Sequence, residues 1–103
     1  MKTFSLMMAV QSPIKSRFDL GKINVSEGGM KLGPGTAMRY IRRHAAGDWG
    51  EFNESKKLEN EYNLKHGQPI MSAYVLPDQI ICVITLGDRS STLLFIHGEE
   101  MSD

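Results

Sequence analysis

The chain has 103 residues, the size of one ordinary domain with a single hydrophobic core. Hydrophobic residues make up 41% and charged residues 23%, which are globular values and exclude an intrinsically disordered chain. Basic and acidic residues both number 12, so the formal net charge is zero. This balance disfavours a duplex-binding protein, which needs an excess of cations, and it makes self-association easier.

The cellular location of the protein is inferred from its single cysteine and from the short length of its apolar segments. Cys82 is the only cysteine, so the chain forms no disulfide with itself and nothing indicates an oxidising compartment. The apolar stretch at residues 6–10 is shorter than a signal-peptide core, and no segment approaches the length of a membrane span. We expect a cytoplasmic protein with no membrane partner, made of a single domain over residues 1–103.

The N-terminal third is rich in loops. Residues 4–10 are predicted to form a strand that ends at Ser12-Pro13. A second short strand is predicted over residues 18–25, although its apolar alternation breaks at Gly21-Lys22. Gly28-Gly29 then predicts a turn or bend.

The first clear helix is predicted to run to about Ala46. Its start contains both Pro34, which suits a first helical turn, and Thr36, which suits a cap, and either alternative is compatible with the sequence. Gly47 fits the left-handed position just after the end. One apolar stripe recurs at i, i+4 and i+8, formed by Ala37, Ile41 and Ala45.

A second helix is predicted over residues 54–65, with Asn53 as its cap and Gly67 as its stop. Most of its side chains are charged, while Leu58 and Tyr62 share one face. We expect this helix to pack lightly against the rest.

The last third predicts three strands, over residues 70–76, 79–86 and 91–96, because these runs are rich in β-branched and aromatic residues. Short links between them imply an antiparallel meander. The middle run is apolar at nearly every position, so we expect it to be central and covered on both faces. The predicted fold class is α+β: two helices packed on a small antiparallel sheet, made of this meander plus one or two N-terminal strands.

A first polar cluster lies where the first helix ends. Arg42, Arg43, His44, Asp48 and Trp49 combine two guanidinium groups, an imidazole, a carboxylate and an aromatic face. These groups suit phosphate or carboxylate binding, with His44 as a candidate catalytic residue. The structural alternative is that Trp49 packs at the edge of the core, Asp48 caps the turn, and the basic residues interact favourably with the negative end of the helix dipole.

A second polar cluster links two of the predicted strands. Asp88, Arg89 and Thr92 are candidate catalytic residues and Ser90 is a candidate binding residue, because hydroxyls beside an arginine can hold an oxyanion. The structural alternative is that these residues form a turn with an ordinary surface ion pair.

Metal and cofactor sites are not indicated. The three histidines and Cys82 have no ligand spacing in the sequence, and no complete glycine-rich phosphate loop occurs. We expect no metal and no cofactor.

Three motifs in order carry a resemblance: Arg43-His44-x-x-Gly47-Asp48-Trp49-Gly50, Ser72-Ala73-Tyr74, and Ile84-Thr85-x-x-Asp88-Arg89-Ser90-x-Thr92. Over roughly residues 20–96 the chain resembles a family of small, mostly uncharacterised bacterial proteins found on plasmids, phages and other mobile elements. The resemblance implies an accessory gene of mobile DNA and carries no established activity. The family pattern has an acid at Leu86, a second threonine at Leu93 and a proline at His97, and residues 1–17 form an N-terminal extension that the family need not share.

Three functional hypotheses follow. The first is a non-enzymatic accessory protein of a mobile element that binds a host or defence-system protein of the restriction or CRISPR type. The second is a small enzyme like a ribonuclease toxin, with His44 as acid or base and Arg89 holding the developing charge. The third is a nucleic-acid-binding protein whose patch consists of Arg39, Arg42, Arg43 and Trp49. A homo-oligomer is compatible with each of them.

Overall fold

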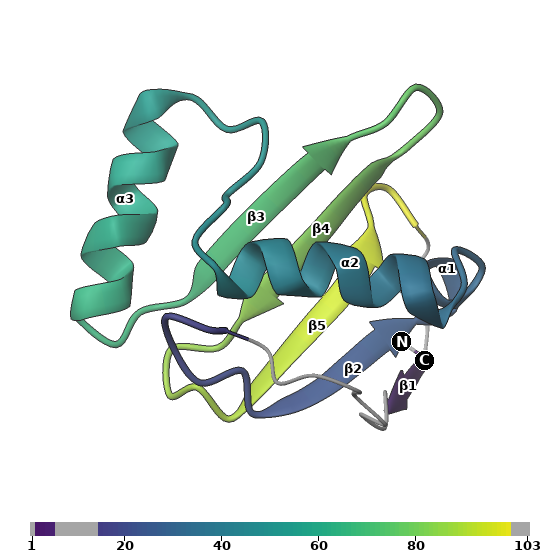
Figure 1. Ribbon diagram of the computed structural model, residues 1–103, viewed down its shortest axis with the longest axis horizontal. Coiled ribbons are helices and arrows are strands. Elements are labelled where there is room, and N and C mark those ends of the chain that lie inside the picture. Colours follow the sequence, from purple (N-terminus) through teal and green to yellow (C-terminus); the bar gives the residue numbers. More distant parts are fainter. Residues whose placement is uncertain (1, 6–14, 100–103) are drawn as a thin grey trace.

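A computed structural model describes residues 2–5 and 15–99, and these residues form an α+β fold with a five-stranded mixed sheet and three helices (Figure 1). The order of the strands across the sheet is β1-β2-β5-β4-β3. The elements in chain order are β1 Thr3–Ser5, β2 Lys22–Ser26, α1 Glu27–Met30, α2 Pro34–Ala45, α3 Glu54–Lys65, β3 Ile70–Val75, β4 Ile80–Thr85 and β5 Ser91–Ile96.

The predicted C-terminal meander is confirmed. β3 pairs antiparallel with β4, and β4 pairs antiparallel with β5, so that Thr85 lies between Ile70 and Thr92. Each of the first two strands is slightly shorter than predicted, since β3 ends at Val75 and β4 covers Ile80–Thr85.

The prediction of a purely antiparallel sheet is wrong. β2 pairs with β5 in parallel, which places Ile23 beside Thr92 and Val25 beside Leu94. The chain between these strands, which contains the three helices and also β3 and β4, provides the long crossover that parallel pairing requires. The second predicted strand starts four residues late, at Lys22, because Gly21 has a φ of 64° and a Cβ there would lie 2.3 Å from the backbone of Ser90.

Only part of the first predicted strand lies within the described residues. β1 covers Thr3–Ser5 and pairs antiparallel with β2, with Phe4 opposite Val25. Residues 6–10 of the predicted strand, and the Ser12-Pro13 stop, lie outside the described part of the chain.

The predicted turn at Gly28-Gly29 is instead a one-turn helix, α1, which adds a third helix to the two that the sequence predicts. The Ser26 hydroxyl caps this helix by accepting the Gly29 amide at 3.0 Å. The Glu99 carboxylate accepts a hydrogen bond from the Ser26 hydroxyl at 2.6 Å and from the Gly28 amide at 2.7 Å. A contact from the far end of the chain therefore stabilises a turn of helix that local sequence does not predict.

α2 follows the prediction closely. Gly33 is its N-cap with a φ of 90°, and Pro34 occupies the first helical position, so the alternative start at Thr36 is excluded. The predicted stripe is fully buried, at 0% exposure for Ala37, Ile41 and Ala45. This stripe packs on the apolar side chains of the sheet and forms the hydrophobic core.

The helices leave one face of the sheet open. α2 crosses one face, and α3 stands beside the edge strand β3 (Figure 1). Ile81 and Val83 of β4 point under α2 and are fully buried, whereas Ile80 and Ile84 point the other way and are partly exposed. Cys82, on the same face as Ile80 and Ile84, is buried at 2% exposure, so within the described residues the prediction that this strand is covered on both faces holds in part.

Candidate functional site

His44 of the first polar cluster points into the core from the last turn of α2. Its side chain is completely buried, and both ring nitrogens have hydroxyl partners. Nδ1 lies 2.6 Å from Oγ of Ser72, and Nε2 lies 2.9 Å from Oγ1 of Thr85. Burial, with a smaller contribution from the charge of Arg89, lowers the pKa of His44 to about 3, so the ring is neutral at neutral pH.

The two polar clusters meet inside the fold through a chain of hydroxyl groups. Oγ1 of Thr85 lies 2.7 Å from Oγ1 of Thr92, and the Thr92 hydroxyl donates to the carbonyl oxygen of Leu20 at 2.7 Å. The structure thus brings His44 and Thr92 together in the core rather than in an open cleft, since both are 0% exposed. Ser72 and Thr85 belong to the sequence motifs but are not among the candidate site residues predicted from the sequence. The signal that could have identified them is a hydroxyl side chain within an otherwise apolar strand.

Arg43 and Asp48 hold the turn that follows α2. Nε of Arg43 lies 2.6 Å from Oδ2 of Asp48, and the guanidinium sits 4.5 Å from the ring centre of Tyr74. The hydrogen bond from Arg43 lowers the pKa of Asp48, as does the bond from the Gly50 amide. The Tyr74 hydroxyl donates to the Asp48 carbonyl oxygen at 2.7 Å. The side chains of Arg43 and Asp48 are partly exposed, at 40% and 45%, and they pair with each other within the turn.

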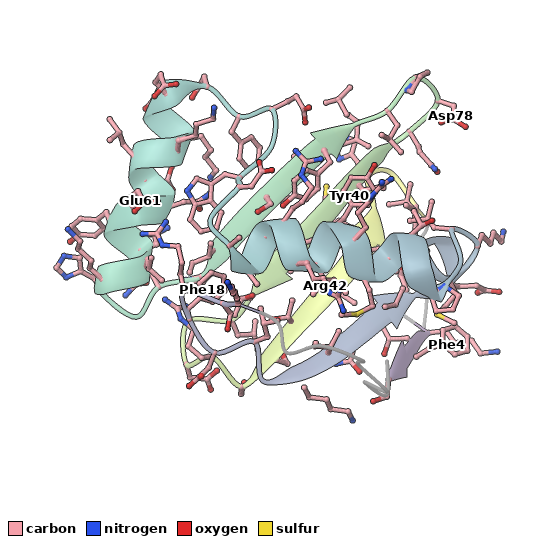
Figure 2. All side chains as sticks on the ribbon, viewed as in Figure 1. Phe4, Phe18, Tyr40, Arg42, Glu61 and Asp78 are labelled. Carbon is pink, nitrogen blue, oxygen red and sulfur yellow. The ribbon has the colours of Figure 1, made fainter. Side chains whose placement is uncertain are left out.

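Trp49 fastens α3 to the body of the protein. Its side chain is 4% exposed, and its Nε1 donates to a carboxylate oxygen of Glu61 at 3.0 Å. The same carboxylate accepts two hydrogen bonds of 2.9 Å from Arg17, which lower its pKa. Phe18 stacks on the Trp49 ring with 6.2 Å between ring centres. Glu61 lies on α3 (Figure 2).

Arg89 closes the C-terminal end of α3. Its guanidinium donates to the carbonyl oxygens of Asn63 and Leu64, at 3.1 and 3.4 Å, and to those of Gln68 and Leu86, at 2.8 and 3.1 Å. The residue adopts a left-handed conformation with a φ of 61°. Its donors are therefore committed to carbonyl groups at the end of α3 and of β4.

The remaining candidates lie at the surface. Asp88 is exposed, and its carboxylate accepts the amide of the exposed Ser90 at 3.0 Å; hydrogen bonds from Ser90 lower its pKa. Arg42 is exposed on α2 (Figure 2), as is Arg39 one turn earlier. The structure thus separates Asp88, Ser90 and Arg42 from the buried chain around His44.

We expect the substitution Arg89→Lys to lower the free energy of unfolding by about 1–2 kcal/mol. A lysine ammonium cannot reproduce the planar fork that reaches carbonyl groups on two segments. Urea unfolding measures the change, with Arg39→Lys, at an exposed site on α2, as the control. Equal stability of the two variants would contradict a capping role for Arg89.

The buried His44 also predicts a pH dependence of stability. Its pKa in the folded protein, about 3, is below the usual 6.5, so the unfolded chain takes up a proton that the folded protein refuses. Stability is therefore complete above about pH 6.5 and falls as the pH drops from there toward 3. Between pH 7 and pH 5 we expect a loss of about 2 kcal/mol, measured by urea unfolding.

The control for this pH dependence is His44→Gln, which removes the titrating group. Asp48 and Glu61 have lowered pKa values, and their contributions are lost only as the pH falls through their lower range. The slope between pH 7 and pH 5 should therefore flatten in the variant. A slope that the variant keeps would assign the effect to another group.

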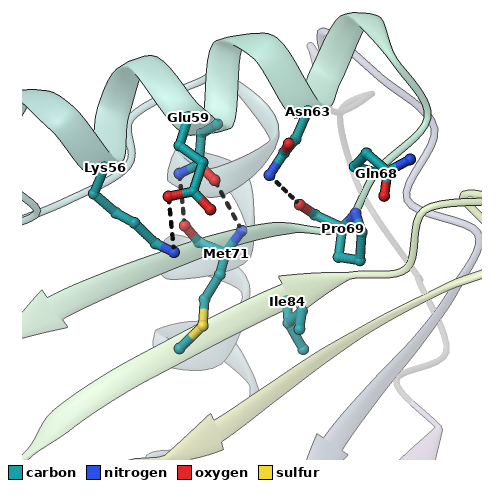
Figure 3. A pocket seen from close by; sticks show the side chains of 8 residues that line it. Lys56, Glu59, Asn63, Gln68, Pro69, Met71 and Ile84 are labelled. Atoms are coloured by element: carbon teal, nitrogen blue, oxygen red, sulfur yellow. Dashed lines mark hydrogen bonds and ion pairs between the residues drawn. The ribbon is translucent and has the colours of Figure 1, made fainter.

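A pocket of about 390 Å³ lies between α3 and the open face of the sheet. Figure 3 shows Lys56, Glu59 and Asn63 along one wall, with Met71 and Ile84 at the floor. Lys56 and Glu59 form an ion pair of 3.5 Å. The pocket therefore joins a polar wall to an apolar floor.

Asn60, at the centre of α3, fixes the helix against β3. Its side-chain amide donates to the Met71 carbonyl oxygen at 2.7 Å and accepts the Met71 amide at 3.3 Å. Leu58 and Tyr62 lie on the outward face of the helix, with 68% and 60% of their surface exposed. α3 is thus held by polar contacts along one side.

Within residues 2–5 and 15–99, no group of three or more histidine, cysteine, aspartate or glutamate side chains gathers as metal ligands. None of the helices in these ranges has the length and apolar character needed to cross a membrane.

Comparison of the chain with family models, with curated proteins and with solved structures found no match.

Proposed function

We propose that this chain is a non-enzymatic accessory protein of a mobile genetic element, which acts in the cytoplasm by binding a host or defence-system protein of the restriction or CRISPR type. The proposed genetic context comes from the three sequence motifs. The proposed mode of action, binding without catalysis, comes from the geometry of the molecule.

One observation carries the binding mode: among the described residues, the polar groups singled out for chemistry are largely used within the fold, while apolar side chains at the ends of the sheet face opposite α2 are exposed. A general acid or base must reach the proton that it transfers. His44 is 0% exposed and bonded at both ring nitrogens, and the Arg89 donors are bound to carbonyl groups. By contrast, Val75 and Leu86, at the ends of the open face, are 53% and 45% exposed.

The ribonuclease-like hypothesis and the nucleic-acid hypothesis stay predictions with tests of their own. Growth arrest on expression would favour an enzyme over the proposal. So would cleavage of RNA by the unchanged chain together with no cleavage by a folded His44→Gln variant. A steep fall of nucleic-acid affinity with rising salt, reduced in Arg39→Ala and Arg42→Ala, would favour the third hypothesis.

The direct test is capture of a partner by the full chain from the lysate of a bacterial host. We expect one protein in a stoichiometric complex that survives gel filtration. The negative control is the chain unfolded by heat before capture. Absence of any stoichiometric partner across hosts and growth conditions would overturn the proposal. Cleavage of RNA by the purified chain would favour the enzyme hypothesis instead.

A further inference from the structure

Helix α3 adds no side chain to the hydrophobic core that the described residues form. Its apolar residues Leu58 and Tyr62 are 68% and 60% exposed, and its one buried residue is the polar Asn60. α2 has the same length of 12 residues, but five of its residues are buried against the rest of the fold. The two helices are therefore held to the sheet by different forces.

α3 is held by hydrogen bonds to three separate segments of the protein. The Asn60 side chain bonds to both backbone groups of Met71 on β3. Glu61 pairs with Arg17, in the segment before β2, and Arg89 donates to carbonyl oxygens at the C-terminal end of α3. Water replaces such bonds when they break, so each contributes a small net free energy. The pair of Arg17 and Glu61 is also 44% and 39% exposed, so water screens its attraction.

The helical form of α3 depends on these contacts. A helix of 12 residues is marginal in water on its own, and most helical stability in proteins comes from packing of an apolar face. Once the contacts break, α3 has no buried apolar face that keeps it helical. The core under α2 contains no α3 residue and loses none of its own packing. Detachment and unfolding of α3 are therefore one local event.

The segment that can detach has a fixed point at each end. Before it, Gly50 forms a bridge with Ala73, and the Glu51 amide donates to the Ala73 carbonyl oxygen at 2.9 Å. After it, β3 begins at Ile70, which is 0% exposed. The mobile unit between these points is residues 53–68, which we name the α3 strap.

We propose that the α3 strap opens as a unit while α2 and the sheet stay folded, and that opening uncovers the edge of β3 at Met71. Asn60 occupies the amide and the carbonyl oxygen of Met71, so both groups lose their partner when the strap leaves. The pocket beside them loses its polar wall, which α3 supplies (Figure 3). This inference concerns a motion of the chain and does not rest on the proposed function.

The test is amide hydrogen exchange of the full chain, followed by NMR at urea concentrations below the unfolding transition. Exchange that requires global unfolding accelerates steeply with urea, because unfolding exposes a large surface, whereas a local opening responds weakly. We expect the amides of residues 58–65 to be at least 10-fold less protected than that of Val83 on the central strand β4, with a nearly flat response to urea. Equal protection and an equal urea response would overturn the inference.

Two neighbouring amides on β3 report whether the edge is uncovered. The Met71 amide points outward to Asn60, and the next residue, Ser72, faces β4, where it lies opposite Val83. We expect the Met71 amide to show the weak urea response of the strap and the Ser72 amide to show the steep response of Val83. If Met71 exchanged like Ser72, α3 would unwind without releasing the edge, and the inference would fail.

The substitution Val25→Ala separates the two kinds of opening. Val25 is 0% exposed on β2, which β5 and β4 separate from β3. Its packing is lost on global unfolding but kept when only the strap opens. We expect exchange at Val83 to rise by about 10-fold or more and exchange in residues 58–65 to change by less than about 3-fold.

An equal rise of exchange at Val83 and in residues 58–65 would show that α3 opens only with the whole fold, and would overturn the inference. The urea response of the unchanged chain decides the same question without any substitution, so the test does not depend on the folding of the Val25→Ala variant.

Discussion

The substitution His44→Ala is expected to lower the free energy of unfolding by about 3–5 kcal/mol, the largest effect of any single side-chain truncation considered for this chain. Two costs add up. The first is a cavity at a fully buried site, where the ring also contacts Phe18 and Trp49 edge-on. The second is the loss of hydrogen-bond partners for Ser72 and Thr85, whose hydroxyls lie in the core.

Urea unfolding of the purified chain measures this loss, and Arg42→Ala, an exposed change on the same helix, is the control, with an expected effect within about 0.5 kcal/mol. Because a loss of this size approaches the whole stability of a small domain, Ser72→Ala provides a milder variant, with an expected cost of about 1–2 kcal/mol. If His44→Ala left stability unchanged, the buried chain of hydroxyls would not hold the fold.

Gly50→Ala is expected to cost about 3 kcal/mol or more, through the backbone rather than through a lost side chain. Gly50 has a φ of 81°, and a Cβ at this position would lie 1.9 Å from the carbonyl oxygen of Ala73. The chain would have to move away from β3. The hydrogen bonds from Ala73 to Trp49 and from Glu51 to Ala73, of 3.2 and 2.9 Å, would then break.

Gly35→Ala is the matched control for this prediction. Gly35 lies in the first turn of α2, and nothing is within 4 Å of an added Cβ. Alanine should therefore stabilise the protein by about 0.5–1 kcal/mol because it favours the helix. Thermal unfolding should show a lower Tm for Gly50→Ala and a higher Tm for Gly35→Ala. A shift of both Tm values in the same direction would contradict the role given to the close contact between Gly50 and the Ala73 backbone.

These two predictions bear on the interpretation of the first motif. His44 fills the core, Asp48 pairs with Arg43 in the turn, and Trp49 binds Glu61 of α3. Gly50 allows the chain to run against β3. Each of these positions in the motif has a structural reason for its residue.

Local sequence was sufficient where an element depends on its own residues. The apolar stripe of α2 and the three C-terminal strands were predicted from periodicity and from β-branched content, and the structure has them at nearly the predicted bounds. α1 was missed because its cap depends on Glu99, which lies more than seventy residues from Ser26 in the chain.

The parallel pairing of β2 with β5 could also not be predicted from the sequence. The alternation of Ile23 and Val25 shows which side of the strand is buried but does not name the neighbouring strand or its direction. Helix α3 is a related case: Leu58 and Tyr62 share a face as noted from the sequence, yet the helix is held by Asn60 and Glu61 instead.

What the sequence by itself determined is the α+β class, the principal helices and the antiparallel meander, because these follow from local hydrophobic period and from turn chemistry. Tertiary structure decided the direction of β2, the burial of His44 against Thr85 and the partial exposure of Ile80 and Ile84 on the sheet face opposite α2. The physical reason is common to all three. A side chain's environment is set by the segments that pack against it, and these lie far away in the chain, where no local pattern records them.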